Sequence, residues 1–144
     1  MAAREELLQG EVKVLLLTPQ VLEFRLRGYV TRGLLKRALA QGAALLEAHP
    51  AVGATLWDAA GVTGYDAGGV ALGIEWTRAH ARGVRASALV TRSPTVAAFT
   101  RVATVLLPWV QSLSFASREE ALSFVDGATR ARRNTPVRGV TRAA

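Results

Sequence analysis

LWDAAGVTGYDAGGVAL, the stretch from Leu56 to Leu72, decides the fold of this chain. It reads as a buried strand that ends at a carboxylate, Asp58, followed by a glycine-rich loop and a helix that begins near a second carboxylate, Asp66. In an α/β domain, the junction between a strand end and a helix start is where ligands, phosphates or partners usually bind. The stretch therefore predicts an α/β domain whose functional site lies in this loop.

Two strands, a helix and the start of a third strand are predicted upstream. Residues 11–17 and 21–27 read as an antiparallel hairpin, and in the second strand apolar and charged residues alternate, which is typical of a strand with one solvated face. Thr31 is placed to cap a helix that runs to about Ala48. Residues 51–57 are apolar almost throughout, as expected of a central strand.

Helices and strands alternate downstream. The predicted elements are a helix at about residues 67–82, a strand at 84–91, a helix from Ser93-Pro94 to Leu107, a strand at 111–115, and a last helix whose capping box is Ser117 and Glu120. Such alternation implies right-handed crossovers and parallel strands. The sequence thus predicts an α/β fold with a small mixed, mainly parallel sheet of about five strands and about four helices.

Composition narrows the classes of function. The chain has 144 residues, half of them hydrophobic, which suits one domain with a real core. It has no cysteine, which excludes disulfides, thiolate metal sites and cysteine nucleophiles. No apolar run approaches the roughly 18 residues of a membrane span, and the N-terminus does not resemble a signal peptide. We therefore expect a cytoplasmic protein.

Most of the net charge of +7 lies at the C-terminus. After Asp126 the chain contains five arginines and no acidic residue, so the remainder is nearly balanced. We expect one domain at residues 1–128 and a basic, disordered tail at 129–144. The tail could contact nucleic acid or anionic lipid through its charge, but it has no aromatic residue to stack on bases, and specific nucleic-acid binding is not expected.

A family resemblance rests on three features. The order of elements, the loop within Leu56 to Leu72, and the ending SFASREEAL at residues 114–122 together resemble the STAS domain, the family of the anti-sigma-factor antagonists. The similarity is greatest to its SpoIIAA-like members, which are sometimes grouped with lipid-binding Sec14-type domains, and it covers roughly Val12 to Val125. It implies a small sheet with helices mostly on one side, and binding of proteins or apolar ligands rather than catalysis.

The resemblance also locates a partner-binding loop. In the family, a serine in a D-S-S-G-like turn is phosphorylated to switch partner binding, and the corresponding run here is Asp66-Ala67-Gly68-Gly69. Gly68 occupies the position of that serine and carries no hydroxyl, so we expect the phosphorylation switch to be absent. The residues expected to bind a partner protein are Asp58, Tyr65, Asp66, Gly68, Gly69 and Val70.

Catalytic and metal-binding motifs are not recognised. The glycines lack the lysine and Ser/Thr of a phosphate loop, and His49 and His80 lack the spacing of a zinc motif. Asp58 and Asp66 could form an acid–base or metal pair, but local capping explains both more simply, with Asp66 at the start of the following helix. We expect no metal, no cofactor and no enzymatic activity.

The segment from Val96 to Val110 is more apolar than contact on one side requires. Leu106 is expected to face the sheet. The residues expected to form a second apolar surface, for a partner or ligand, are Val102, Val105, Leu107 and Trp109; burial of both faces is the alternative.

The sequence predicts a non-enzymatic regulatory module that binds another protein or a second copy of itself. The alternative is a module that associates with membranes or binds an apolar ligand such as a lipid.

Overall fold

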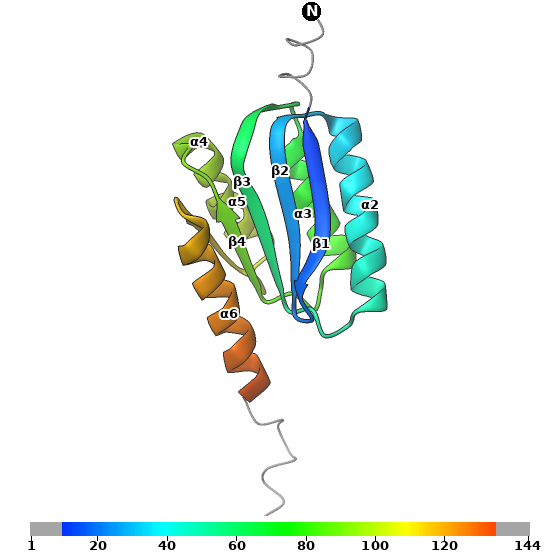
Figure 1. Cartoon of the computed structure of the whole chain (residues 1–144), viewed down its shortest axis with the longest axis vertical. Helices are drawn as coiled ribbons and strands as arrows, with labels where there is room; N and C mark the ends of the chain where they lie inside the picture. Colours follow the sequence, from blue (N-terminus) through cyan, green and yellow to red (C-terminus); the bar gives the residue numbers. More distant parts are fainter. Residues whose placement is uncertain (1–9, 135–144) are drawn as a thin grey trace, which may run out of the picture.

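Five strands form one sheet at the centre of the computed structural model, which describes residues 10–134 (Figure 1). The strands lie side by side in sequence order, and only the first pair, β1 and β2, is antiparallel. Their bounds are β1 Glu11–Thr18, β2 Val21–Val30, β3 Ala54–Tyr65, β4 Ala86–Val90 and β5 Gln111–Phe115. The predicted α/β fold with a mixed, mainly parallel sheet is confirmed.

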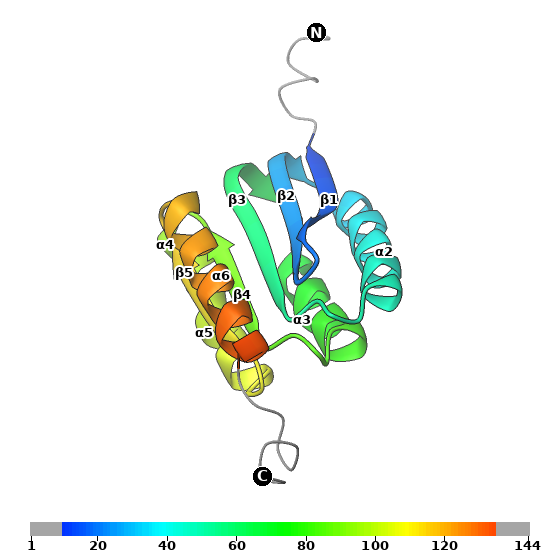
Figure 2. The same ribbon diagram turned by 60° about the horizontal axis from the view of Figure 1, so that its bottom comes forward.

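Helices cover the two faces of the sheet unequally (Figures 1 and 2). Four helices lie on one face: α2 Arg32–Ala48, α3 Gly69–His80, α4 Pro94–Ala97 and α5 Phe99–Leu106. Within residues 10–134, α6 Arg118–Asn134 is the one helix on the other face, where it packs on β3, β4 and β5. The single helix expected at residues 94–107 is divided into α4 and α5 at Ala98.

Capping side chains begin three helices as the sequence predicts. The Thr31 hydroxyl accepts a hydrogen bond from the Leu34 N–H at 3.1 Å, and so satisfies a free donor in the first turn of α2. Ser93 accepts from the Val96 N–H at 3.2 Å before α4. Ser117 accepts from the Glu120 N–H at 3.2 Å before α6.

Three aromatic rings form the centre of the larger core. Phe24 of β2 stacks on Trp57 of β3 with ring centroids 4.1 Å apart, and the edge of Trp76 of α3 meets the Phe24 ring at 5.3 Å. The Trp76 indole N–H donates to the Leu39 carbonyl at 2.7 Å, so its polar atom is satisfied in the core. Gly42 of α2 lies directly against this cluster.

β3 is longer than predicted. Residues 59–65, expected as a glycine-rich loop, continue the strand to Tyr65 because β2 also continues, through an irregularity at Gly28, and supplies hydrogen-bonding partners as far as Val30. Gly64 lies against the Tyr29 ring, where a Cβ would be only 2.9 Å from a ring carbon. The glycines therefore allow close contact between strands, and the loop is reduced to residues 66–68.

Two further expectations are wrong. Glu23, expected on a solvated face of its strand, is fully buried because α6 covers that face. The tail was expected to begin at residue 129, but α6 continues to Asn134, and the buried Thr129 donates its hydroxyl proton to the Val125 carbonyl at 3.0 Å. The remainder of the predicted tail, residues 135–144, lies outside the described residues.

Candidate functional site

Asp66 connects three elements at the predicted partner-binding loop. Its carboxylate accepts one hydrogen bond from the Tyr29 hydroxyl and a second from the Arg32 backbone N–H, each at 2.8 Å. Arg32 is the first residue of α2, and its N–H has no acceptor within the helix. Together with Thr31, Asp66 therefore caps α2, whose first residue lies 34 positions before it in the chain.

The expected role of Asp66 as the cap of the following helix is wrong. That helix, α3, begins at Gly69, and its capping residue is Gly68, which makes no side-chain hydrogen bond. Gly68 has φ of 84°, a left-handed conformation that glycine adopts without strain. This turn at Gly68 moves the start of α3 away from Asp66, which leaves the carboxylate free to reach α2.

Hydrogen bonding alters the acidity of this pair. The Arg32 backbone N–H, followed by the Tyr29 hydroxyl, holds the pKa of Asp66 below its usual value, because both donors favour the ionised carboxylate. The same contact raises the pKa of Tyr29, because a phenolate beside the carboxylate would lose the hydrogen bond and repel it. Asp66 is therefore ionised and Tyr29 protonated at neutral pH.

Asp58 lies away from the other predicted site residues. Successive side chains of β3 point to opposite faces, so Asp58 points towards α6 while Trp57 and Ala59 point towards the helices opposite. The guanidinium of Arg118 donates to the Asp58 carboxylate at 2.7 Å. Asp58 also accepts a hydrogen bond from the Ala60 N–H at 3.2 Å, which is the local hydrogen bonding that the sequence analysis favoured over a pair with Asp66.

Arg118 also binds the buried Glu23. The sequence did not predict this ion pair. The Arg118 guanidinium donates twice to the Glu23 carboxylate, one bond being 3.1 Å and the other shorter, while Arg25 donates from the open side at 3.2 Å. Burial raises the pKa of Glu23, but the hydrogen bonds from Arg118 and then Arg25 outweigh it and lower the pKa overall. The sequence feature that could have indicated the Arg118–Glu23 ion pair is the arginine at the start of the helix after β5.

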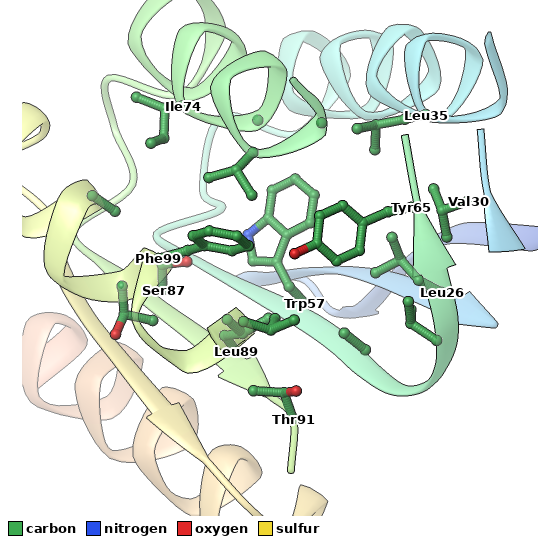
Figure 3. Close-up of a pocket in the computed structure, with 18 of the residues that line it drawn as sticks. Leu26, Val30, Leu35, Trp57, Tyr65, Ile74, Ser87, Leu89, Thr91 and Phe99 are labelled. Atoms are coloured by element: carbon green, nitrogen blue, oxygen red, sulfur yellow. The ribbon is translucent and has the colours of Figure 1, made fainter. Parts of the chain in front are cut away.

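An apolar cavity of about 380 Å³ lies between the sheet and the helices α3 and α5 (Figure 3). Figure 3 shows the side chains of Trp57, Tyr65 and Phe99 extending into it. Ser87 and Leu89 of β4, and Thr91 directly after it, lie along one wall. The face of β3 and β4 towards the cavity is only partly covered, since Trp57 and Leu89 are half-buried. On the opposite face, Leu56 and Ala88 are completely buried under α6.

The cavity borders the predicted partner-binding loop. Tyr65, Gly69 and Val70, three of the predicted site residues, all line it. The Tyr65 ring meets the Phe99 ring edge-to-face with centroids 6.0 Å apart, and so connects the end of β3 to the start of α5. The loop, α5 and the cavity are therefore parts of one region, which the sequence treated as two separate surfaces.

The predicted apolar surface divides into exposed and buried residues. Val102 and Val105 are exposed, at 46% and 76% of their maximal area, as expected of a surface. Leu107 is buried in the core, and Trp109 is half-buried beneath the guanidinium of Arg82. Leu106, expected to face the sheet, is 43% exposed, because α5 ends there and the chain turns inward at Leu107. We define the α5 patch as Val102, Val105 and Leu106.

Neither a metal site nor a membrane span occurs within residues 10–134. No group of three or more metal-ligating side chains comes together in this range. No helix in it is long and apolar enough to cross a bilayer.

Comparison with known proteins identifies the fold. No protein-family model and no curated protein matches the chain. Among solved structures, an uncharacterized DUF3478-family protein with a SpoIIAA-like fold from Shewanella loihica has a TM-score of 0.62 at 16% identity, over 81% of this chain and 93% of that one. The unphosphorylated anti-sigma factor antagonist SpoIIAA has a TM-score of 0.60 at 21% identity, over 81% of this chain and 98% of its own.

The phosphorylated form of SpoIIAA, the Bacillus cell fate determinant, is also similar. Its TM-score is 0.56 at 22% identity, over 79% of this chain and 98% of its own. The predicted resemblance to STAS domains is thus confirmed at the level of the fold, which is SpoIIAA-like.

Proposed function

We propose that this chain, which has the SpoIIAA-like fold, is a non-enzymatic cytoplasmic module that regulates another protein by binding it. The α5 patch is the observation that carries the proposal. Within residues 10–134 five large hydrophobic side chains are exposed, and three of them lie on this eight-residue helix. Clustered apolar exposure marks a surface that another molecule covers.

The binding surface in this proposal continues from the α5 patch to the loop at residues 66–68. Tyr65 is 37% exposed and meets Phe99, so an apolar path joins the two. The loop carries the exposed Ala67 between Asp66 and Gly68. Because Ala67 and Gly68 have no hydroxyl, binding at this loop proceeds without a phosphorylation switch.

Affinity purification of the full chain from its native host tests the proposal. We expect the double variant Val102→Ser/Val105→Ser, and separately Ala67→Arg, to lose a copurified partner or self-association. Leu113→Ser is the matched control, since Leu113 is also exposed, at 39%, but lies on β5 outside the patch. Equal recovery of the partner with the unmodified chain, the two variants and the control would contradict the proposal. If the patch variant instead loses binding to anionic vesicles in high salt, the partner is a membrane.

The cavity favours a second function, the binding of an apolar small molecule. Its volume of about 380 Å³ and its apolar lining are those of small-molecule sites. The uncharged fluorescent probe N-phenyl-1-naphthylamine tests this function. We expect its emission to rise on addition of the protein, and Gly73→Leu, which adds a side chain at an open position lining the cavity, to reduce the rise. No change in emission would exclude this function.

A further inference from the structure

A row of hydroxyl groups crosses the floor of the cavity. Thr55 of β3 is in register with Ser87 of β4, and Ser87 is in register with Ser112 of β5. Ser87 and Ser112 line the cavity, while Thr55 is buried beside them. The floor therefore carries hydroxyl groups at this level, where a bound molecule can form a hydrogen bond.

The hydrogen bonds in this row run from Trp57 through Thr55 to Ser87. The Trp57 indole N–H can only donate, and it donates to the Thr55 hydroxyl oxygen at 3.2 Å. The Thr55 hydroxyl proton is then directed to the Ser87 oxygen, 3.0 Å away. Ser87 thus accepts within the row, and its hydroxyl donates no further hydrogen bond among those found within residues 10–134. That proton is available to a molecule in the cavity.

Charge excludes ionised ligands. Within residues 10–134, no aspartate, glutamate, lysine, arginine or histidine lines the cavity. A carboxylate or ammonium group placed there would lose its hydration without gaining a counterion, which is strongly unfavourable. A neutral oxygen acceptor loses much less and regains one hydrogen bond.

We propose that the cavity binds a small uncharged molecule with an apolar body and one acceptor oxygen, such as a ketone, ester or ether, which accepts the Ser87 hydroxyl proton. The apolar body contacts Trp57, Leu89 and Phe99, and Ser87 sets its orientation. This inference rests on the second function proposed above and names the class of ligand for it.

Competition against N-phenyl-1-naphthylamine with three molecules of equal chain length tests the inference. The molecules are 2-octanone, octane and octanoate, measured at pH 8 with the full chain. We expect 2-octanone to bind about threefold to tenfold more tightly than octane, as one neutral hydrogen bond allows. Octanoate, which is ionised at this pH, should compete least of the three.

Variants assign the preference to Ser87. Ser87→Ala, and Ser87→Cys as a second variant that keeps the volume, should bind 2-octanone and octane equally while the affinity for octane stays unchanged. Thr100→Val is the matched control: Thr100 also lines the cavity, but its hydroxyl proton is already donated to the Ala97 carbonyl at 2.8 Å. This variant should retain the preference for the ketone.

Two results would overturn the inference in different ways. If the unmodified chain binds 2-octanone and octane equally, or if the preference survives in both Ser87 variants, the ligand class is wrong while apolar binding stands. If none of the molecules, including the probe, enters the cavity, the second function and this inference fail together.

Discussion

Asp66 at the end of β3 accepts a hydrogen bond from the hydroxyl of Tyr29, near the end of β2, with an oxygen–oxygen distance of 2.8 Å. The other carboxylate oxygen binds the first N–H of α2. In this way a residue of the proposed partner-binding loop is held by two other elements. The position of the loop therefore depends on contacts with β2 and α2 as well as on the helix that follows it.

The first prediction concerns the acidity of Asp66. Since the Tyr29 hydroxyl helps to lower the pKa of Asp66, Tyr29→Phe should raise that pKa towards the ordinary value for aspartate. The carboxyl carbon of Asp66, followed by NMR during an acid titration, measures the change. Tyr65→Phe is the control, because the hydroxyl that donates to this carboxylate is that of Tyr29, while the Tyr65 ring packs against Phe99. An unchanged midpoint in Tyr29→Phe would contradict the geometry.

The second prediction concerns stability in acid. Glu23 has a lowered pKa in the folded protein, so its contribution to stability is present above its unfolded pKa of about 4.3 and is lost as the pH falls through the lower folded value. Arg118→Met removes hydrogen bonds that lower the pKa of Glu23, while burial still raises it. The pKa of Glu23 should therefore rise in this variant. We expect this variant to lose about 3 kcal/mol of unfolding free energy at pH 7.

The pH dependence of that loss separates the ion pair from simple packing. Protonation removes the unpaired buried charge, so the stability difference between Arg118→Met and the unmodified protein should shrink as the pH falls from 7 to 4. Arg130→Met, which removes an exposed ion pair with Asp126 on the same helix, should cost less than about 1 kcal/mol. A difference that is constant with pH would contradict the prediction.

The third prediction concerns close packing at Gly42. A Cβ there would lie 2.6 Å from Phe24 and 3.0 Å from Trp76, both buried rings that cannot move aside. Gly42→Ala should therefore lower the unfolding free energy by about 1–3 kcal/mol, although alanine is the better helix former. Gly73→Ala, on α3 with no atom within 4 Å of the new Cβ, should instead stabilise by up to about 1 kcal/mol. Chemical denaturation measures both values.

The fourth prediction concerns the C-terminal end of the domain. A chain that ends at Asn134 should keep its melting temperature, because the described part of α6 is complete. A chain that ends at Ala128 loses the buried Thr129 and its hydrogen bond to Val125, and should melt several degrees lower. Equal melting temperatures for the two chains would restore the boundary that the sequence suggested.

Local patterns in the sequence determined the elements and their order. Thr31, Ser93 and Ser117 mark helix starts correctly because a capping hydroxyl acts on N–H groups only two or three residues away. The alternation of strands and helices likewise determined the mainly parallel sheet, since crossover connections leave few alternatives. These signals depend on neighbouring residues, and the sequence contains them directly.

Only the tertiary structure decided which partner each polar or apolar side chain has. The sequence placed Glu23 on a solvated face, because nothing near it in the chain shows that α6 covers that face. It placed Asp66 at the start of the helix that follows, because nothing near it shows that α2 begins beside it. It also could not divide the α5 segment into the buried Leu107 and the exposed Val105, or show that α3 and α5 leave a cavity over β3 and β4. Burial and pairing depend on segments that are distant in the chain, and they become fixed only when those segments pack together.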